Sequence, residues 1–596
     1  MATSDFYHPS LAFLLMAVVL PFLPGNRRWK WLLLLPPIAA IYAAFVNAPG
    51  DHLTLEWLGL KLKLGHVDPL SRIFSQVFAI MSLAGIIFSL HVNDKGQHMA
   101  ALLYVTGGFG CLMAGDYLTL FVFWELMSIG STFLVMLNRT RESVLAAFRY
   151  FMYHVAGGLL LLAGLLLRYS ITKSFDFGPI EAQTATYADW LILAGFCVNA
   201  AVVPLHAWLP DAYPRGTVTG SVFMCAYTTK TAVYVLARAF PGWEILAVAG
   251  TIMAVYGVLY ASMENNARRI LSYHIVSQVG YMVAGIGVGT YMTINGASAH
   301  AYAHILYKGL LFMAAGTVLY AAGTQKLDEL GGLASRLPWV MVFYMVAALS
   351  ISGMPLFNGF VSKTMTIAGA AEAHRTWVAL GLELAAVGTF ISVGLKLPYF
   401  AFWGGKAPDP NRELKPIPAN MYVGMALLAI LCLAQGLYPD MLYRYLPYQD
   451  VPGGMFVPWT PWNVIQAAML LGFSGLAFYV MRKVIEPHKA LNLDFDWFYR
   501  LIGRAVLFLI CRPCAAIDNV WTVVWDKVGL RFLKACGIST SWFDRKAIDG
   551  VVDGSAYGVK GIGTVTAFLQ NGRLQHYLGL MVVLGLLIFA FFWYGF

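Results

Sequence analysis

Long apolar stretches recur along the whole sequence, and they restrict this chain to the class of membrane proteins. Each is close to or above the roughly 18 residues that a helix needs to cross the hydrocarbon core of a bilayer. Hydrophobic residues make up 59% of the chain and charged residues only 12%, whereas a soluble domain carries about 25% charged residues. We therefore exclude the soluble classes and predict an all-α polytopic membrane protein.

The apolar pattern predicts about sixteen transmembrane helices. The predicted spans cover residues 9–25, 29–47, 68–92, 97–115, 117–137, 143–170, 187–212, 216–240, 243–263, 268–291, 295–322, 337–374, 376–403, 418–438, 463–482 and 575–595.

Basic residues gather in alternate loops, those that follow the first, fifth, ninth and thirteenth predicted spans. They are Arg27, Arg28, Lys30, Arg139, Arg141, Arg268, Arg269, Lys406, Arg412 and Lys415. Such loops face the cytoplasm in proteins of a bacterial-type inner membrane, so we expect both termini in the periplasm. The same distribution accounts for the net charge of +10 and argues against a nucleic-acid partner.

Two segments depart from the spanning pattern. Residues 52–64 alternate apolar and polar side chains around a central glycine, which predicts a β-hairpin on the periplasmic side. Residues 483–574 form a long cytoplasmic stretch in which Trp521, Val524 and Val528 recur every three or four residues. This amphipathic pattern predicts a helix that lies along a membrane surface or a partner. An ordinary surface linker is the alternative.

Two predicted spans contain helix-breaking residues. The span 187–212 includes the run Pro-Leu-His-Ala-Trp-Leu-Pro-Asp-Ala, and the span 337–374 includes Gly-Met-Pro-Leu-Phe-Asn-Gly at 353–359. Backbone groups freed by such residues are tolerated in a membrane where they line a polar cavity. Paired broken helices in the two halves of a chain point to an ion site.

Several ionisable side chains fall inside predicted spans, where each costs at least about 2.5 kcal/mol by insertion scales and is functional by default. Burial and neighbouring charges let lysines and carboxylates change charge, and histidines titrate near neutrality. A spacing of four places two histidines and a lysine of the span 295–322 on one helix face. The predicted ion-translocating residues are Glu125, Lys230, His300, His304, Lys308, Lys363 and Lys396. A static, paired charge is the alternative for each of them taken singly.

Five further residues of these spans are candidates for supporting roles: Arg149, Asn199, His206, His274 and Glu383. We expect Arg149 to balance Glu125, because their spans are adjacent. His206 lies in the predicted break of the span 187–212, where a structural role and a relay role are both open. His274 either holds water or forms a hydrogen bond between helices.

The motifs resemble those of the antiporter-like subunits, which are the proton-pumping membrane subunits of respiratory complex I and the homologous D and A subunits of Mrp-type cation/proton antiporters. The resemblance is carried by Trp-Glu125, by the two proline-containing runs, by the 300–308 face and by Val-Ser-Lys363. It covers residues 60–405 and is weaker in the C-terminal part.

The resemblance implies two inverted five-helix repeats and a lateral helix. It suggests the following division: 1–96, N-terminal helices and hairpin; 97–240, first repeat; 241–405, second repeat; 406–482, additional helices; 483–574, amphipathic lateral region; 575–596, final span.

One position departs from the family pattern. Many relatives carry a lysine before the Pro-Leu-His run, whereas this chain has Asn199, which does not take up a proton as lysine does. Either Lys230 alone pairs with Glu125, or the first half of the path is impaired.

The resemblance implies an ion-translocating subunit of a larger membrane complex, embedded in the lipid bilayer beside other membrane subunits. Ions would enter past Glu125 and Lys230 and leave past Lys363 and Lys396. The residues do not decide between H⁺ and Na⁺. We expect no cofactor and no metal, since Cys511 and Cys514 form a lone CxxC pair. The alternatives are a stand-alone secondary transporter of a small solute and a membrane partner of an inorganic-carbon uptake complex.

Overall fold

The computed structural model describes residues 6–24, 27–404, 413–451, 454–488 and 492–595. About 77% of the chain is helical. The chain divides into two units, Met1–Phe495 and Asp496–Phe596. Two of the predicted basic loop residues, Lys406 and Arg412, lie outside the described residues.

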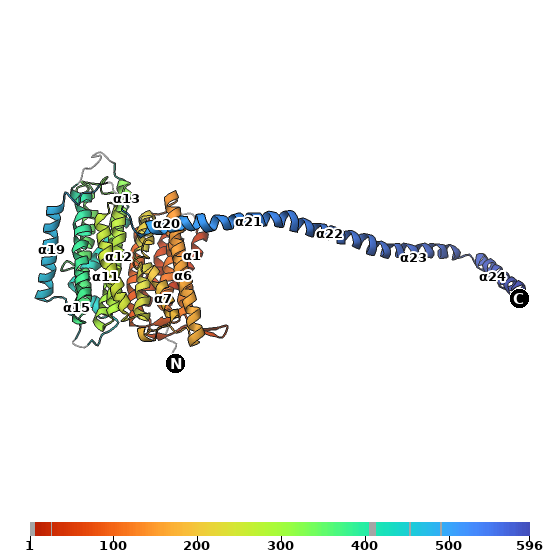
Figure 1. Cartoon of the computed structure of the whole chain (residues 1–596), viewed down its shortest axis with the longest axis horizontal. Helices are drawn as coiled ribbons and strands as arrows, with labels where there is room; N and C mark the ends of the chain where they lie inside the picture. The colour runs from red at the N-terminus through yellow and green to blue at the C-terminus, as the bar shows by residue number, and fades with distance from the viewer. Residues whose placement is uncertain (1–5, 25–26, 405–412, 452–453, 489–491, 596) are drawn as a thin grey trace. The chain divides into compact units, whose positions relative to one another are not determined.

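The first unit is a bundle of helices, several of which run side by side in Figure 1. Its α-helices are α1 (Pro9–Val19), α2 (Leu35–Val46), α3 (Pro69–Ser89), α4 (Lys95–Met113), α5 (Tyr117–Met136), α6 (Arg141–Thr172), α7 (Tyr187–Asn199), α8 (Trp208–Ala212), α9 (Val218–Met224), α10 (Thr228–Ala239), α11 (Glu244–Met263), α12 (Ala267–Val288), α13 (Tyr291–Ala322), α14 (Pro338–Ser352), α15 (Asn358–Glu372), α16 (Thr376–Thr389), α17 (Ala419–Leu437), α18 (Asp440–Tyr443) and α19 (Pro461–Met481). Short 3-10 and π-helical turns accompany them: η1 (Leu20–Phe22), η2 (Arg27–Leu34), η3 (Ala182–Thr184), η4 (Tyr213–Arg215), η5 (Phe390–Lys396) and η6 (Tyr399–Trp403).

Ten helical segments of the described chain are long and apolar enough to cross a membrane. They are Arg28–Val46, Pro69–Ser89, Tyr117–Met136, Arg141–Thr172, Glu244–Met263, Tyr291–Ala322, Thr376–Trp403, Ala419–Leu437, Pro461–Met481 and Leu574–Tyr594. The other six predicted spans fall on α1, α4, α7–α8, α9–α10, α12 and α14–α15. Three of these six are broken into shorter helices, so the count of sixteen stays a prediction.

Side-chain caps start several of the long helices. Capping boxes form at α3, between Asp68 and Ser71, and at α13, between Thr290 and Thr293. Each box satisfies backbone N–H groups that the first helical turn leaves without a partner. The helix α13 ends at Gly323, whose φ of 74° suits glycine. Local sequence signals therefore set both ends of α13.

The helix α13 lies at the centre of the first unit. It packs against α3, α9, α12, α14, α15 and α17. In its most apolar 18-residue stretch, 89% of the residues are buried. Its polar residues are therefore enclosed by protein rather than by lipid, as expected for ionisable groups at membrane depth.

Both predicted helix breaks are confirmed. Residues 200–207 form turns between α7 and α8, and residues 353–357 separate α14 from α15. Leu356 in the second break adopts a positive φ of 79°. A third break, at Cys225–Tyr227 between α9 and α10, was not predicted, because no proline or glycine marks it.

The predicted hairpin is also confirmed. Strand β2 (Thr54–Trp57) pairs antiparallel with β3 (Leu60–Lys63), and β1 (Gly50–Asp51) pairs with β4 (His66–Val67). Leu58 and Gly59 at the tip both have positive φ, at 50° and 74°, as the tight hairpin turn requires.

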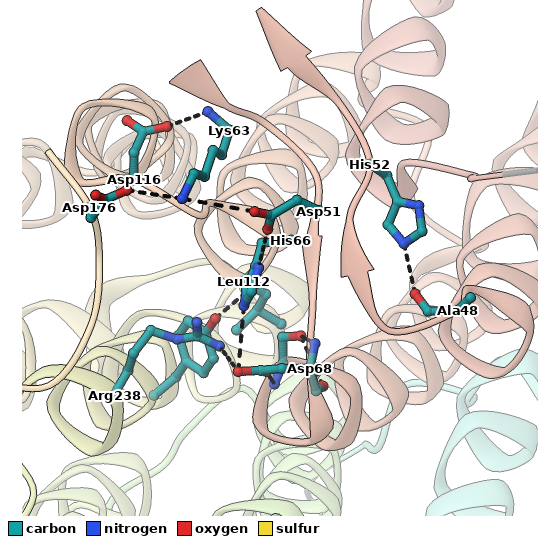
Figure 2. Close-up of polar contacts among 12 residues, drawn as sticks. Ala48, Asp51, His52, Lys63, His66, Asp68, Leu112, Asp116, Asp176 and Arg238 are labelled. Carbon is teal, nitrogen blue, oxygen red and sulfur yellow. Dashed lines mark hydrogen bonds and ion pairs between the residues drawn. The ribbon is translucent and has the colours of Figure 1, made fainter. Parts of the chain in front are cut away.

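Charged side chains fasten the hairpin to neighbouring helices, as Figure 2 shows. His66 Nδ1 lies 2.5 Å from Asp51, and its Nε2 lies 3.7 Å from Asp68 at the start of α3. The Arg238 guanidinium at the end of α10 lies 2.5 Å from Asp68. Lys63 lies 2.9 Å from Asp176 and 3.8 Å from Asp51. This cluster of ion pairs joins the hairpin to the ends of α3, α6 and α10.

The second unit continues the helical segment that begins at Phe495. The α-helices of this segment are α20 (Phe495–Val506), α21 (Arg512–Val524), α22 (Arg531–Phe543), α23 (Asp549–Leu569) and, after a turn, α24 (Leu574–Tyr594). The π-helical stretches η7 (Leu507–Cys511), η8 (Trp525–Leu530) and η9 (Asp544–Ile548) join α20 to α23 without a break. The large apolar side chains of this unit are exposed, and Cys511 and Cys514 are exposed free thiols.

Candidate ion-translocation site

The predicted polar face of α13 is fully enclosed. His300, His304 and Lys308 each have 0% of their surface exposed. Within the described residues, neither ring nitrogen of His304 and no atom of the Lys308 amine has a hydrogen-bond partner. Burying polar atoms without partners costs free energy. These buried polar groups therefore lower the stability of the bundle rather than add to it.

His300 connects α13 to the broken helix α14–α15. Its Nδ1 lies 3.0 Å from the hydroxyl oxygen of Ser362, and its Nε2 lies 3.5 Å from the hydroxyl of Tyr307. Ser362 directly precedes Lys363 on α15. A polar chain thus runs from the centre of α13 to the residue beside Lys363.

Lys363 forms a hydrogen bond with a backbone carbonyl at the helix break. Its Nζ donates to the carbonyl of Ile351 at 2.6 Å, in the last turn of α14, and lies 4.9 Å from the centre of the Tyr281 ring. A helix C-terminus presents unsatisfied carbonyls and partial negative charge, which favour an ammonium group. The lysine therefore satisfies a backbone carbonyl that the break between α14 and α15 leaves without a helical partner.

The helix α12 adds further polar partners. His274 Nε2 lies 2.7 Å from the hydroxyl of Ser392, so this histidine makes a hydrogen bond between helices. Tyr307 donates to Gln278 at 3.4 Å. Gln278 donates at the same distance to Thr389. These contacts extend the polar chain from α13 towards α16.

Glu125 in the first half lies against a glycine of the next helix. A Cβ atom added at Gly158 on α6 would collide with the Glu125 carboxylate. Glu125 is half-buried, and its Oε1 has no hydrogen-bond partner within the part of the chain that the structure describes. The absence of a side chain at Gly158 therefore makes room for this carboxylate.

The expected pairing of Arg149 with Glu125 is wrong. Arg149 instead makes two contacts with Asp211 of α8, at 2.7 and 3.1 Å. Arg149 and Gly158 are nine residues apart on α6, or about 13 Å along the helix axis. The carboxylate that faces Gly158 is thus too far away for Arg149, whereas the α7–α8 break brings Asp211 close.

Lys230 lies in the first turn of α10, directly after the third, unpredicted break. Its Nζ donates to the carbonyl of Cys225 at 2.8 Å and to the Thr229 hydroxyl at 3.0 Å. No ion pair joins Lys230 to Glu125 among the described residues. The Oδ1 atom of Asn199, where the resemblance led us to expect a lysine, lies 2.8 Å from His154 Nδ1.

Lys396 and Glu383 both lie in the segment 376–403 but belong to different surroundings. Lys396 Nζ donates to the carbonyls of Ser262 and Glu264 at 2.8 Å each, at the end of α11. Glu383 accepts a hydrogen bond from Gln466 of α19 and, with Lys363, lines a cavity of about 1090 Å³.

His206 lies in the α7–α8 break with 0% of its surface exposed, and its Nε2 is 3.3 Å from Asp494. No sequence pattern indicated Asp494, which lies between Leu493 and Phe495 just before the helical segment that begins at Phe495. Tyr307 and Ser362 were also missed, although Tyr307 lies seven residues after His300 and therefore on the same helix face.

A family model described as NADH:quinone oxidoreductase/Mrp antiporter, TM matches residues 114–392. The D subunit of the Na(+)/H(+) antiporter of Alkalihalophilus pseudofirmus is 31% identical over 359 residues, which cover 56% of this chain and 71% of that protein. The N subunit of the NADH-quinone oxidoreductase of Desulforudis audaxviator is 30% identical over 414 residues, which cover 63% and 82%. A chain of the membrane-bound sulfane sulfur reductase, an archaeal respiratory membrane complex, shares the fold with a TM-score of 0.68 at 22% identity, over 98% of this chain and 99% of that one. The matched residues include both halves of the site described above, and this chain belongs to the NADH:quinone oxidoreductase/Mrp antiporter transmembrane family.

Proposed function

We propose that this chain translocates protons, or sodium ions, as one membrane subunit of a multisubunit cation/proton antiporter or complex I-like pump. The relatives that it matches are named as antiporter and quinone oxidoreductase subunits. One observation carries the proposal for this chain: the buried α13 face, with unpartnered polar atoms at His304 and Lys308 among the described residues, is joined by His300 to Ser362, the residue directly before Lys363.

In this proposal the first half holds the entry group Glu125 and the first lysine, Lys230. Transfer then follows His300, His304 and Lys308. Because an ammonium without an acceptor is costly inside a membrane protein, Lys308 holds a proton only in passing. Lys363 receives the proton beside the α14–α15 break.

The exit leads through the cavity that Lys363 and Glu383 line. This cavity reaches the start of α13 and the turn between α15 and α16, at the predicted periplasmic end. Lys396 contacts the end of α11, just before the basic pair 268–269 of a predicted cytoplasmic loop. These contacts favour a place for Lys396 at the cytoplasmic end of the second half rather than on the exit side.

We further propose a bacterial inner-membrane location with periplasmic termini, sixteen spans, and inverted repeats at 97–240 and 241–405. Residues 1–96 and 406–482 add flanking helices. The region 483–574 forms a lateral amphipathic helix, and 575–596 forms the last span. The positions of the basic loops and the amphipathic pattern support this arrangement.

Replacement of Lys363 tests the function. We expect Lys363→Ala in the native complex, reconstituted into vesicles, to lower ion-coupled proton transport by about tenfold or more, because the relay loses its proton carrier. Transport is followed with a pH-sensitive dye, with and without sodium. Lys326→Ala is the matched control, since Lys326 is an exposed lysine paired with Glu329. Normal transport by an assembled Lys363→Ala complex would show that the relay is wrong.

Purification of the tagged chain tests the subunit assignment. Recovery together with redox subunits indicates a redox-driven pump, and recovery with small hydrophobic subunits indicates a secondary antiporter. Recovery of a fully active chain by itself would contradict the assignment and favour a stand-alone transporter.

A further inference from the structure

The residues 492–495, here called the strap, place one acidic side chain deep inside the first unit. Asp494 has 4% of its surface exposed. Its carboxylate accepts hydrogen bonds from Tyr256 of α11 at 2.5 Å and from Tyr273 of α12 at 2.6 Å. A buried charge needs such partners, so this is a built site rather than a linker residue at the surface.

Main-chain contacts hold the strap in place around this carboxylate. Tyr260 donates to the carbonyl of Leu493 at 3.0 Å, and Asn492 donates to the carbonyl of Met263 at 3.2 Å. The amide of Phe495 donates to Asp494 at 2.6 Å. The strap is thus fastened to the end of α11 by the residues that precede Asp494.

The fourth partner of Asp494 is His206 in the α7–α8 break. His206 Nε2 lies 3.3 Å from the carboxylate, which is an ion-pair distance, and neither ring nitrogen of His206 makes a hydrogen bond among the described residues. His206 also packs edge-on against Tyr256, at 4.9 Å between ring centres. An ion pair forms here when the imidazole is protonated, since neutral histidine carries no charge.

Other polar groups surround the pair from each element packed against it. Tyr256 and Tyr260 come from α11, and Tyr273 and Arg269 come from α12. Arg269 lies over the Tyr273 ring at 5.9 Å and pairs at 3.3 Å with Glu264, in the turn before α12. Arg269 is therefore partly neutralised by a carboxylate of its own.

The surroundings keep Asp494 ionised. Burial by itself would raise the pKa of the carboxyl group, but the contact with His206 and the two tyrosine hydroxyls together hold the pKa below its ordinary value of 3.8. These contacts therefore favour the ionised form of the Asp494 carboxyl group.

The strap also touches the turn that holds a lysine of the second half. Asn492 contacts the carbonyl of Met263, and the carbonyls on either side, of Ser262 and Glu264, accept from Lys396. The strap therefore contacts the turn that holds Lys396 through Asn492, and it contacts His206 through Asp494.

Building on the proposed function, we propose that Asp494 is a positioning residue for ion transfer: it orients the imidazole of His206 in the α7–α8 break and ties that break to the turn that holds Lys396. The strap then contributes to ion transfer in both halves of the path. Asn199 leaves the first break without the lysine of its relatives, and His206 is the titratable side chain that this break does contain.

The test compares variants of the full chain in the native complex, reconstituted into vesicles. Asp494→Asn keeps the shape and removes the charge. We expect transport to fall about fivefold or more, with a changed dependence of its rate on pH, and Asp494→Glu to restore part of both. His206→Gln should change the pH profile in the same way, and the double variant should be no worse than either single one.

Asn492→Ala is the comparison variant, because it removes the contact with the turn that holds Lys396 and leaves the charge of Asp494 in place. If Asp494→Asn and Asn492→Ala lower transport equally with an unchanged pH profile, Asp494 is an anchor and the inference is wrong. If Asp494→Asn does not assemble, the profile of His206→Gln decides, and an unchanged profile overturns the inference. Lys363→Ala, measured alongside, separates the two proposals: if Lys363→Ala is inactive while Asp494→Asn is normal, only the strap inference fails.

Discussion

At the residue scale, three of the buried lysines offset the free-energy cost of burial in the same way. Each ammonium group donates to carbonyls at the C-terminal end of a helix: Lys230 at the end of α9, Lys363 in the last turn of α14 and Lys396 at the end of α11. Helix ends supply partial negative charge without a carboxylate. These lysines therefore do not need a fixed counter-ion, so that their charge can change without leaving an uncompensated carboxylate behind.

A lysine that carries protons is distinguished from a static charge by Lys363→Arg. Arginine keeps the positive charge but does not release a proton in proteins. The cavity of about 1090 Å³ beside Lys363 gives the larger guanidinium room. We expect transport in the reconstituted complex to fall about tenfold or more while assembly is unchanged.

Lys326→Arg, at the exposed pair with Glu329, is the control and should transport normally. Full transport by Lys363→Arg would mean that a fixed positive charge is sufficient at this position and that Lys363 does not release its proton during transport.

The glycine beside Glu125 gives a second prediction at this scale. Gly158→Ala should lower transport severalfold, because the new Cβ collides with the Glu125 carboxylate and displaces it. Gly472→Ala on α19 is the matched control, since no described atom lies within 4 Å of a Cβ there. Both variants replace a helical glycine by the better helix former. Equal transport rates for the two would show that the position of the carboxylate is unimportant.

The identity of the buried charges was predictable from the sequence, but their partners were not. A lysine or histidine in an apolar span is visible by itself, and His300, Lys308 and Lys363 are indeed buried. The partner of Arg149 depends on where Asp211 lies after the α7–α8 break, which no local pattern encodes. The same holds for Asp494, whose tyrosine partners lie more than two hundred residues earlier in the chain.

At the scale of elements, breaks were predictable where proline or glycine causes them. The α7–α8 and α14–α15 breaks follow this rule. The α9–α10 break does not, because distant groups satisfy its backbone: the Tyr213 hydroxyl donates to the carbonyl of Met224, and the amide of Thr228 donates to Tyr104. Tertiary contacts thus replace the local signal.

The hairpin is predicted to loosen as the pH rises. Asp68 and Asp51 beside the ring hold the pKa of His66 above its ordinary value of 6.5, against the effect of burial. Because the pKa is raised in the folded hairpin, the stabilisation is complete below about pH 6.5 and is lost as the pH rises through the raised pKa. Hydrogen exchange of residues 50–67, corrected for its intrinsic pH dependence, should therefore show weaker protection at about pH 9 than at about pH 6.

His66→Gln should remove most of this change in protection. His52→Gln is the control within the same hairpin, because His52 contacts the carbonyl of Ala48 rather than a carboxylate. A pH dependence that survives in His66→Gln would assign it to another group of the cluster in Figure 2.

At the scale of the whole molecule, the class and the family were predictable, since both depend on long repeated patterns. The apolar stretches predicted a mostly helical membrane protein, and the ordered motifs between residues 60 and 405 predicted the family. The number of spans was harder to predict, because length and apolarity identify only ten segments of the described chain. Three of the other six predicted spans are broken into short helices, and α4 and α12 are long but not among the ten. An amphipathic pattern predicted a helix within residues 483–574, and the structure has continuous helix from Phe495 to Leu569.

The exposed apolar side chains of the second unit predict that it binds the partners of this chain. A surface with Trp521, Phe532 and Trp542 exposed is typical of a protein or membrane contact. A chain that ends at Phe495 keeps the whole first unit, including the strap. We therefore expect it to insert and to elute as a single species in detergent, but to lose most of the subunits that co-purify with the full chain. A chain that ends at Gln570 lacks only the last helix and is the control that should retain more of them. Complete retention of the partners by the shorter chain would place the binding surface on the first unit instead.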